Sequence, residues 1–154
     1  MKKLTEKYLQ LTDRLNLSTS LPLFAIRGVL AYGFWGPATM KWKDIGSIAE
    51  WFGSLGIPAP YLNAYLAAGT EIAGVFLLIL GLGTRLISIP LIITMLVAIK
   101  TVHWENGFDA GNNGYEIPIY YIIMLFVLIF FGPGKWSIDQ LINKKCRSVC
   151  GLPH

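Results

Sequence analysis

Four apolar runs of near membrane-spanning length constrain this chain more than any other feature of its sequence. They cover residues 21–39, 61–81, 86–102 and 117–131. A helix rises about 1.5 Å per residue, so each run with its flanks crosses or nearly crosses the apolar core of a bilayer. The chain is 54% hydrophobic and 14% charged, whereas a soluble domain usually carries about a quarter charged residues. The sequence therefore predicts an all-α membrane protein, a four-helix transmembrane bundle.

The connections between the runs indicate how the helices are joined. Only residues 82–85 separate the second run from the third, which requires a tight antiparallel turn, and Gly81 and Gly83 supply the helix stop. In the first connection, residues 41–60, apolar side chains recur at helical intervals and predict a short interfacial helix. The last connection, residues 105–114, is rich in Gly and Asn and predicts a loop.

Charge divides the chain into three segments and sets its orientation. Residues 1–20 alternate apolar and charged side chains at helical spacing and predict an amphipathic helix on the cytoplasmic surface; residues 21–141 form the bundle, and residues 142–154 a cytoplasmic tail. Lys and Arg concentrate on the side that holds both termini, which predicts a multi-pass membrane protein with both ends in the cytoplasm. These residues are Lys2, Lys3, Lys7, Arg14, Arg85, Lys135, Lys144, Lys145 and Arg147.

Two ionisable residues inside the apolar runs predict a buried charge pair. Glu71 stands in the middle of the second run and Arg27 inside the first. A charge near the centre of a bilayer costs roughly 2.5–3.5 kcal/mol on insertion scales, so each needs a partner or a task. We expect Arg27 and Glu71 to pair. The pair acts either as a clasp that docks two helices or in handling a proton or ligand.

A second polar group is expected at the outer ends of the helices. Lys100 and His103 share a helix face, Glu116 and Tyr120 lie one turn apart, and Lys41 ends the first helix. Together they predict a polar pocket at the outer surface. The alternative is an interfacial ring of snorkelling side chains.

Metal and nucleic-acid sites are not predicted. His103 has no second histidine near it, and a lone His is more often a hydrogen-bonded side chain than a ligand. Cys146, Cys150 and His154 recur every fourth residue, but a variable, frayed tail is the favoured interpretation. The basic residues form no contiguous patch, which argues against nucleic acid. No Gly-rich nucleotide loop or nucleophile elbow is present.

Several segments together resemble the DoxX family of small four-helix membrane proteins. The resemblance covers residues 24–141, and its most distinctive motifs are AGTE, GLGTR, AIKTVHWENGF, GYEIP and FGPGKWSID. Within that family the chain is most similar to the HvfX-type branch. The polar residues that match the family pattern are Arg27, Glu71, Arg85, His103 and Glu116.

The resemblance implies an accessory inner-membrane protein that supports maturation of copper-binding, ribosomally made peptides, or protection against copper and oxidative stress. Its partners would be the lipid bilayer, peptide-modifying enzymes, their peptide substrate and, if the chain oligomerises, further copies of itself. The wider family also implies a subunit of a quinone-linked thiol or sulfur oxidoreductase. A structural anchor for partner enzymes is the third interpretation. The predicted spans and outer loops lack cysteine, so redox action there would need a bound quinone, copper or a partner protein.

Overall fold

The computed structural model describes residues 19–150, and over that part of the chain every regular element is helical. The predicted amphipathic helix of residues 1–20 lies almost wholly outside the described residues. The elements, in chain order, are α2 (Ser20–Lys43), α3 (Ile45–Ser54), α4 (Pro60–Leu80), α5 (Thr84–Ala98), the π-helix η1 (Ile99–His103), the 3-10 turns η2 (Trp104–Asn106) and η3 (Ala110–Asn112), α6 (Glu116–Phe131) and α7 (Ile138–Cys150).

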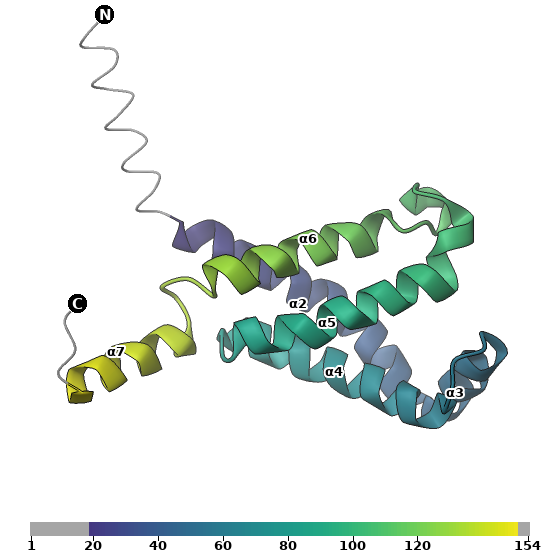
Figure 1. The fold of residues 1–154 in the computed structure, drawn as a ribbon, viewed down its shortest axis with the longest axis horizontal. Helices are drawn as coiled ribbons and strands as arrows, with labels where there is room; N and C mark the ends of the chain where they lie inside the picture. Colours follow the sequence, from purple (N-terminus) through teal and green to yellow (C-terminus); the bar gives the residue numbers. More distant parts are fainter. Residues whose placement is uncertain (1–18, 151–154) are drawn as a thin grey trace, which may run out of the picture.

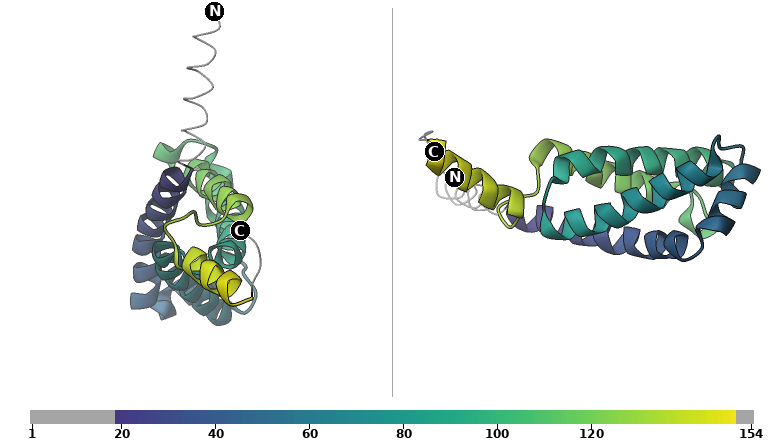
Figure 2. Two further views of the ribbon diagram at one scale, coloured as in Figure 1. Left: turned by 90° about the vertical axis from the view of Figure 1, so that its left-hand side faces the viewer. Right: turned by 90° about the horizontal axis from the view of Figure 1, so that it is seen from below.

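The four long helices α2, α4, α5 and α6 lie side by side along one axis (Figure 1). α2 packs on α4, α4 on α5, and α5 on α6, while α2 and α6 also touch. The predicted interfacial helix is confirmed as α3, which packs on α4 at one end of the molecule. We call this the α3 end. The other end, from which α7 extends, is the α7 end (Figure 2).

The main core lies between the long helices and is apolar. Close approach of α4 and α5 depends on Gly74, because a Cβ there would meet Leu91 side-chain atoms at 2.9 Å. α2 and α6 approach similarly where Gly33 lies against the Tyr121 ring. A smaller, separate cluster of Ala49, Phe52 and Ala64 holds α3 on α4. The residues fully buried in the main core include Leu30, Phe34, Val75, Leu78, Leu91, Leu125 and Leu128.

The predicted tight turn between the second and third runs is confirmed. Gly81 (φ 63°) and Gly83 (φ 57°) both adopt the left-handed conformation, which costs glycine little. The Gly81 N–H reaches the carbonyls of the last turn of α4, and the Leu82 N–H bonds to the Leu77 carbonyl. α4 therefore stops, reverses and continues as α5 within three residues.

We expect Gly81→Ala to destabilise the protein more than Gly83→Ala. Both substitutions place a Cβ on a left-handed residue, at a cost of about 1–2 kcal/mol. At Gly81 the new Cβ would also collide with the Arg27 guanidinium, whereas at Gly83 nothing lies within 4 Å. Thermal unfolding of the two variants in the same detergent checks this order. Equal losses would mean that Arg27 moves aside without cost.

The outside of the bundle is apolar. Large side chains such as Tyr32 (86% exposed), Leu86 (76%) and Phe130 (73%) face outward. Two helical stretches, Pro60–Leu80 and Thr84–Asn106, are long and apolar enough to cross a membrane, yet only 33% and 22% of their most apolar windows are buried. The helix of a soluble core would hide most of that surface. The exposed faces suit contact with lipid.

The end of the chain differs from its expectation. A frayed tail was favoured after residue 142, but α7 continues as a helix to Cys150. Cys146 is exposed on α7. His154 lies outside the described residues.

Candidate functional site

Glu71 is buried in the middle of α4 and pairs with Lys41 at the end of α2. Its side chain is 1% exposed, and that of Lys41 is 17% exposed. The Lys41 Nζ donates to both carboxylate oxygens, at 2.9 Å (Oε1) and 2.7 Å (Oε2). An ammonium bonded to both oxygens of one carboxylate compensates the burial of two charges better than a single contact would.

The expected Arg27–Glu71 pair is not formed, and the direction of helical side chains explains why. Side chains on an α-helix lean toward its N-terminus. Glu71 on α4 therefore leans toward the α3 end, and Lys41 on the antiparallel α2 leans from that end toward Glu71. Arg27, on the same helix as Lys41, also leans toward the α7 end, which is away from Glu71, so the Arg27 and Glu71 side chains diverge.

Arg27 instead joins three chain segments at the α7 end. It is 1% exposed, and its Nη1 donates to the Leu78 carbonyl at 3.1 Å and approaches that of Ile79 at 3.5 Å. Its Nη2 donates to the Trp136 carbonyl, in the link between α6 and α7. A cation at the C-terminus of α4 adds donors to carbonyls of its last turn, which lack their regular partner four residues on. Arg27 thus matches the clasp interpretation, with backbone carbonyls in place of Glu71.

Asp139 completes the arrangement at the α7 end, and sequence reasoning did not single it out. Its Oδ1 accepts from the Gly83 N–H at 2.8 Å and its Oδ2 from the Thr84 N–H at 3.2 Å. Asp139, the second residue of α7, therefore caps the N-terminus of α5, where negative charge is favoured. An acid in a Ser-x-Asp segment after an apolar helix was the only available signal.

A cavity of about 760 Å³ lies at the α3 end, beside the Lys41–Glu71 pair. Its walls come from the end of α2, α3, the link that follows it, α4, α5 and η1. Most lining side chains are apolar, among them Phe52, Leu66 and Val97. The predicted pocket residues Lys41, Lys100 and His103 all line it, and so does Glu71. The cavity combines an apolar wall with one buried ion pair.

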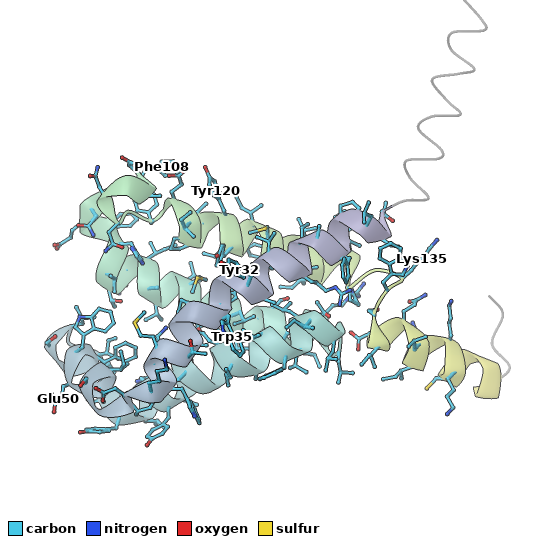
Figure 3. The ribbon with its side chains drawn as sticks, turned by 180° about the vertical axis from the view of Figure 1, so that it is seen from behind. Tyr32, Trp35, Glu50, Phe108, Tyr120 and Lys135 are labelled. Carbon is cyan, nitrogen blue, oxygen red and sulfur yellow. The ribbon has the colours of Figure 1, made fainter. Side chains whose placement is uncertain are left out.

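Glu116 and Tyr120 lie apart from this cavity. The Glu116 Oε2 accepts from the Ala110 N–H at 3.0 Å, and its Oε1 accepts from the Tyr120 hydroxyl at 2.8 Å. These bonds hold η3 against the first turn of α6. Figure 3 shows Tyr120 of α6 at the outer edge of the molecule, on the side where Phe108 of the preceding connection also lies. The predicted five-residue group is therefore divided between a cavity and a loop.

His103 ends the π-helix η1 and faces the cavity with a defined tautomer. Its Nδ1 lies 2.7 Å from the Asn113 carbonyl oxygen, which can only accept, so Nδ1 carries a proton. In the neutral imidazole, Nε2 is then a proton acceptor. π-helical turns are rare in proteins, and those that occur are often found at functional sites. The apolar run gave no sign of this wider turn.

Four threonine or asparagine side chains in the cavity wall were missed: Asn63, Thr70, Thr94 and Thr101. Thr94 and Thr101 donate their hydroxyl hydrogens to the carbonyls of Pro90 (3.0 Å) and Val97 (2.8 Å), so each oxygen remains an acceptor. Asn63 donates to the Pro58 carbonyl at 2.6 Å and fixes the link after α3. A polar residue inside an apolar run was the signal that marks Thr94.

α3 is positioned over the cavity by its own N-cap. The Asp44 carboxylate accepts from the Ser47 hydroxyl at 2.6 Å and from the Ser47 N–H at 3.1 Å. These two hydrogen bonds, the hydroxyl contributing most, hold the pKa of Asp44 below its ordinary value. The cap is present above the ordinary carboxyl pKa and is lost as the pH falls through the lowered one.

Among residues 19–150, no group of three His, Cys, Asp or Glu side chains is arranged to hold a metal ion.

Comparison with known proteins gives relatives over most of the chain. An uncharacterised protein of Haemophilus influenzae is 32% identical over 136 residues, 83% of this chain and 87% of its own. An uncharacterised membrane protein of Mycobacterium tuberculosis is 33% identical over 110 residues, 65% of this chain and 67% of its own. A Bacillus subtilis protein named "Putative oxidoreductase CatD" is 27% identical over 132 residues, 84% of this chain and 93% of its own. No solved structure matches this chain.

The family match falls on the helices that line the cavity. It covers residues 22–104 and so includes α3, α4, α5 and η1 and nearly all of α2. That segment exceeds half of the chain. Together with the membrane-protein relative, it supports a membrane location. The protein belongs to the DoxX family.

Proposed function

We propose that this protein is the membrane subunit of an oxidoreductase and binds a quinone in the cavity at the α3 end. The single observation that carries the proposal is the meeting of an apolar cavity with the Lys41–Glu71 pair and His103. A quinone has an apolar body and two carbonyl oxygens that need donors. The relative whose name includes "oxidoreductase" supports the same class of function.

The chemistry would be divided between the cavity and a partner. Reducing a quinone to a quinol takes two electrons and two protons. A partner oxidoreductase would supply the electrons. The Lys41 and Lys100 ammonium groups line the cavity and can donate to a ligand oxygen, the His103 Nε2 can accept a proton from a bound quinol, and Glu71 compensates the Lys41 charge.

The test is binding of a short-chain ubiquinone analogue to the purified protein in lipid nanodiscs. Trp51 lines the cavity, so the bound quinone should quench tryptophan fluorescence, and the quenching should weaken in Trp51→Phe. We expect Thr94→Phe, which fills the cavity from α5, to lower affinity at least tenfold. Leu96→Phe is the matched control, because Leu96 is an exposed residue of α5 that does not line the cavity.

Two results would contradict the proposal. One is the absence of both quenching by the analogue and native quinone in a lipid extract of the wild-type protein. The other is equal affinity in Thr94→Phe and wild type. Circular dichroism of both phenylalanine variants establishes that they remain folded.

A second proposal follows from the resemblance to the HvfX-type branch. In it the protein supports maturation of copper-binding peptides in the bacterial inner membrane, with the α7 end in the cytoplasm. The cavity would then receive an apolar segment of the peptide rather than a quinone. Copurification of a cysteine-rich peptide in place of quinone, lost in Thr94→Phe, distinguishes it from the first proposal.

A further inference from the structure

A second cavity, of about 470 Å³, lies at the α7 end, opposite the first. It is formed where the start of α5, the end of α6 and the first turns of α7 meet. Its polar lining side chains are Arg85, Asp139, Gln140 and Asn143. None of them belongs to the site at the α3 end.

Arg85 brings hydrogen-bond donors to this cavity that the protein does not use. Among residues 19–150, its guanidinium makes one hydrogen bond, from Nη2 to the Phe130 carbonyl at 3.4 Å, and its side chain is exposed. It lies against Gly132, where a Cβ would be 3.3 Å from both Nε and Nη2. The glycine allows the flat guanidinium to rest on the backbone. A guanidinium with most of its N–H donors unused is suited to bind two oxygens of one phosphate.

The other polar groups favour an anion as well. Both carboxylate oxygens of Asp139 accept N–H groups of Gly83 and Thr84, so its charge is balanced by the N-terminus of α5. Gln140 and Asn143 make no side-chain hydrogen bond within the described residues, which leaves their amide donors for a ligand. Lys135 adds positive charge at the same end (Figure 3).

The surface around the cavity is apolar, which determines the kind of anion. Leu86 and Phe131 line the cavity and are 76% and 73% exposed, and Phe130 beside them is 73% exposed. A free phosphate would leave this apolar surface uncovered, whereas the acyl chains of a phospholipid would pack against it. We propose that the cavity at the α7 end binds the phosphate group of an anionic phospholipid, with Arg85 as its principal ligand.

The test compares lipids on the full-length protein in detergent, with native mass spectrometry counting the lipids retained. The probes are phosphatidylglycerol and phosphatidylcholine, and inorganic phosphate is added as a competitor. We expect phosphatidylglycerol to bind at least tenfold more tightly than phosphatidylcholine. Arg85→Gln should remove this preference, and Gln140→Glu, which adds a negative charge to the cavity wall, should reduce it.

Lys135→Gln is the matched control, because it removes the same charge from the same end but does not line the cavity. Retained preference in this variant supports a defined site. Equal loss in Lys135→Gln and Arg85→Gln would show only diffuse attraction and overturn the proposal. So would tight binding of inorganic phosphate without any preference between the lipids. Quinone binding at the α3 end should not change in Arg85→Gln.

Discussion

Lys41→Met should be the most destabilising single substitution at the α3 end, by about 3–5 kcal/mol, because it leaves a fully buried carboxylate without a partner. Glu71 is 1% exposed, so little water can solvate its unpaired carboxylate. Glu71→Leu should cost less, since Lys41 is 17% exposed and its long side chain can turn toward the surface. Thermal unfolding in nanodiscs measures both effects.

The double variant Lys41→Met/Glu71→Leu separates the pair from the cavity that surrounds it. Removing both charges takes away the desolvation penalty together with the attraction, so stability should return close to that of wild type. Quinone binding should be weakened in Lys41→Met and equally in the double variant, because the Lys41 donor is absent from both. Lys43→Met is the control: Lys43 is exposed two residues further along and forms no ion pair in the described part of the chain. A double variant as unstable as Lys41→Met would contradict this account.

Arg27→Met should destabilise the α7 end by about 3–5 kcal/mol. The substitution removes the hydrogen bonds to the Leu78 and Trp136 carbonyls, and a hydrogen bond to a charged group is worth about 1.5–3 kcal/mol. The stability of Arg27→Lys should lie between those of wild type and Arg27→Met. A single ammonium cannot reach both carbonyls as the wider guanidinium does.

Thermal unfolding measures the stability of Arg27→Met. Limited proteolysis adds a result that a general loss of stability would not reproduce. The Trp136 carbonyl ties the link before α7, so cleavage after Lys135 should accelerate in Arg27→Met. The loop at η3, at the far end, has no Lys or Arg, so a glutamate-specific protease is used there, and cleavage after Glu105 should not change. Equal acceleration at both sites, or wild-type stability of the variant, would contradict the clasp.

The helices and their turns were predictable because their signals are local. Gly81 and Gly83 end one apolar run and begin the next, and the observed α4 and α5 differ from the expected runs by a few residues. α3 was likewise visible as apolar side chains at helical intervals. Each of these signals lies within about ten residues of the feature that it predicts.

The partners of the buried charges were not predictable in the same way. Whether Glu71 meets Arg27 or Lys41 depends on the lean of side chains on two antiparallel helices, and the sequence holds both bases on the same helix. The separation of Glu116 and Tyr120 from His103 depends on hydrogen bonds that fold the loop at η3 back onto α6. Tertiary geometry decides such matters, and spacing along the chain does not report it.

The unequal lengths of the helices have a consequence for the surrounding lipid. α6 has 16 residues and α4 has 21, so they extend about 24 Å and about 31 Å at 1.5 Å per residue. A hydrocarbon layer of about 30 Å matches α4 but exceeds α6. With these helices across the bilayer, as the sequence predicts, we expect the membrane to be thinner on the α6 side of the protein than on the α4 side, because a short hydrophobic helix thins the adjacent bilayer.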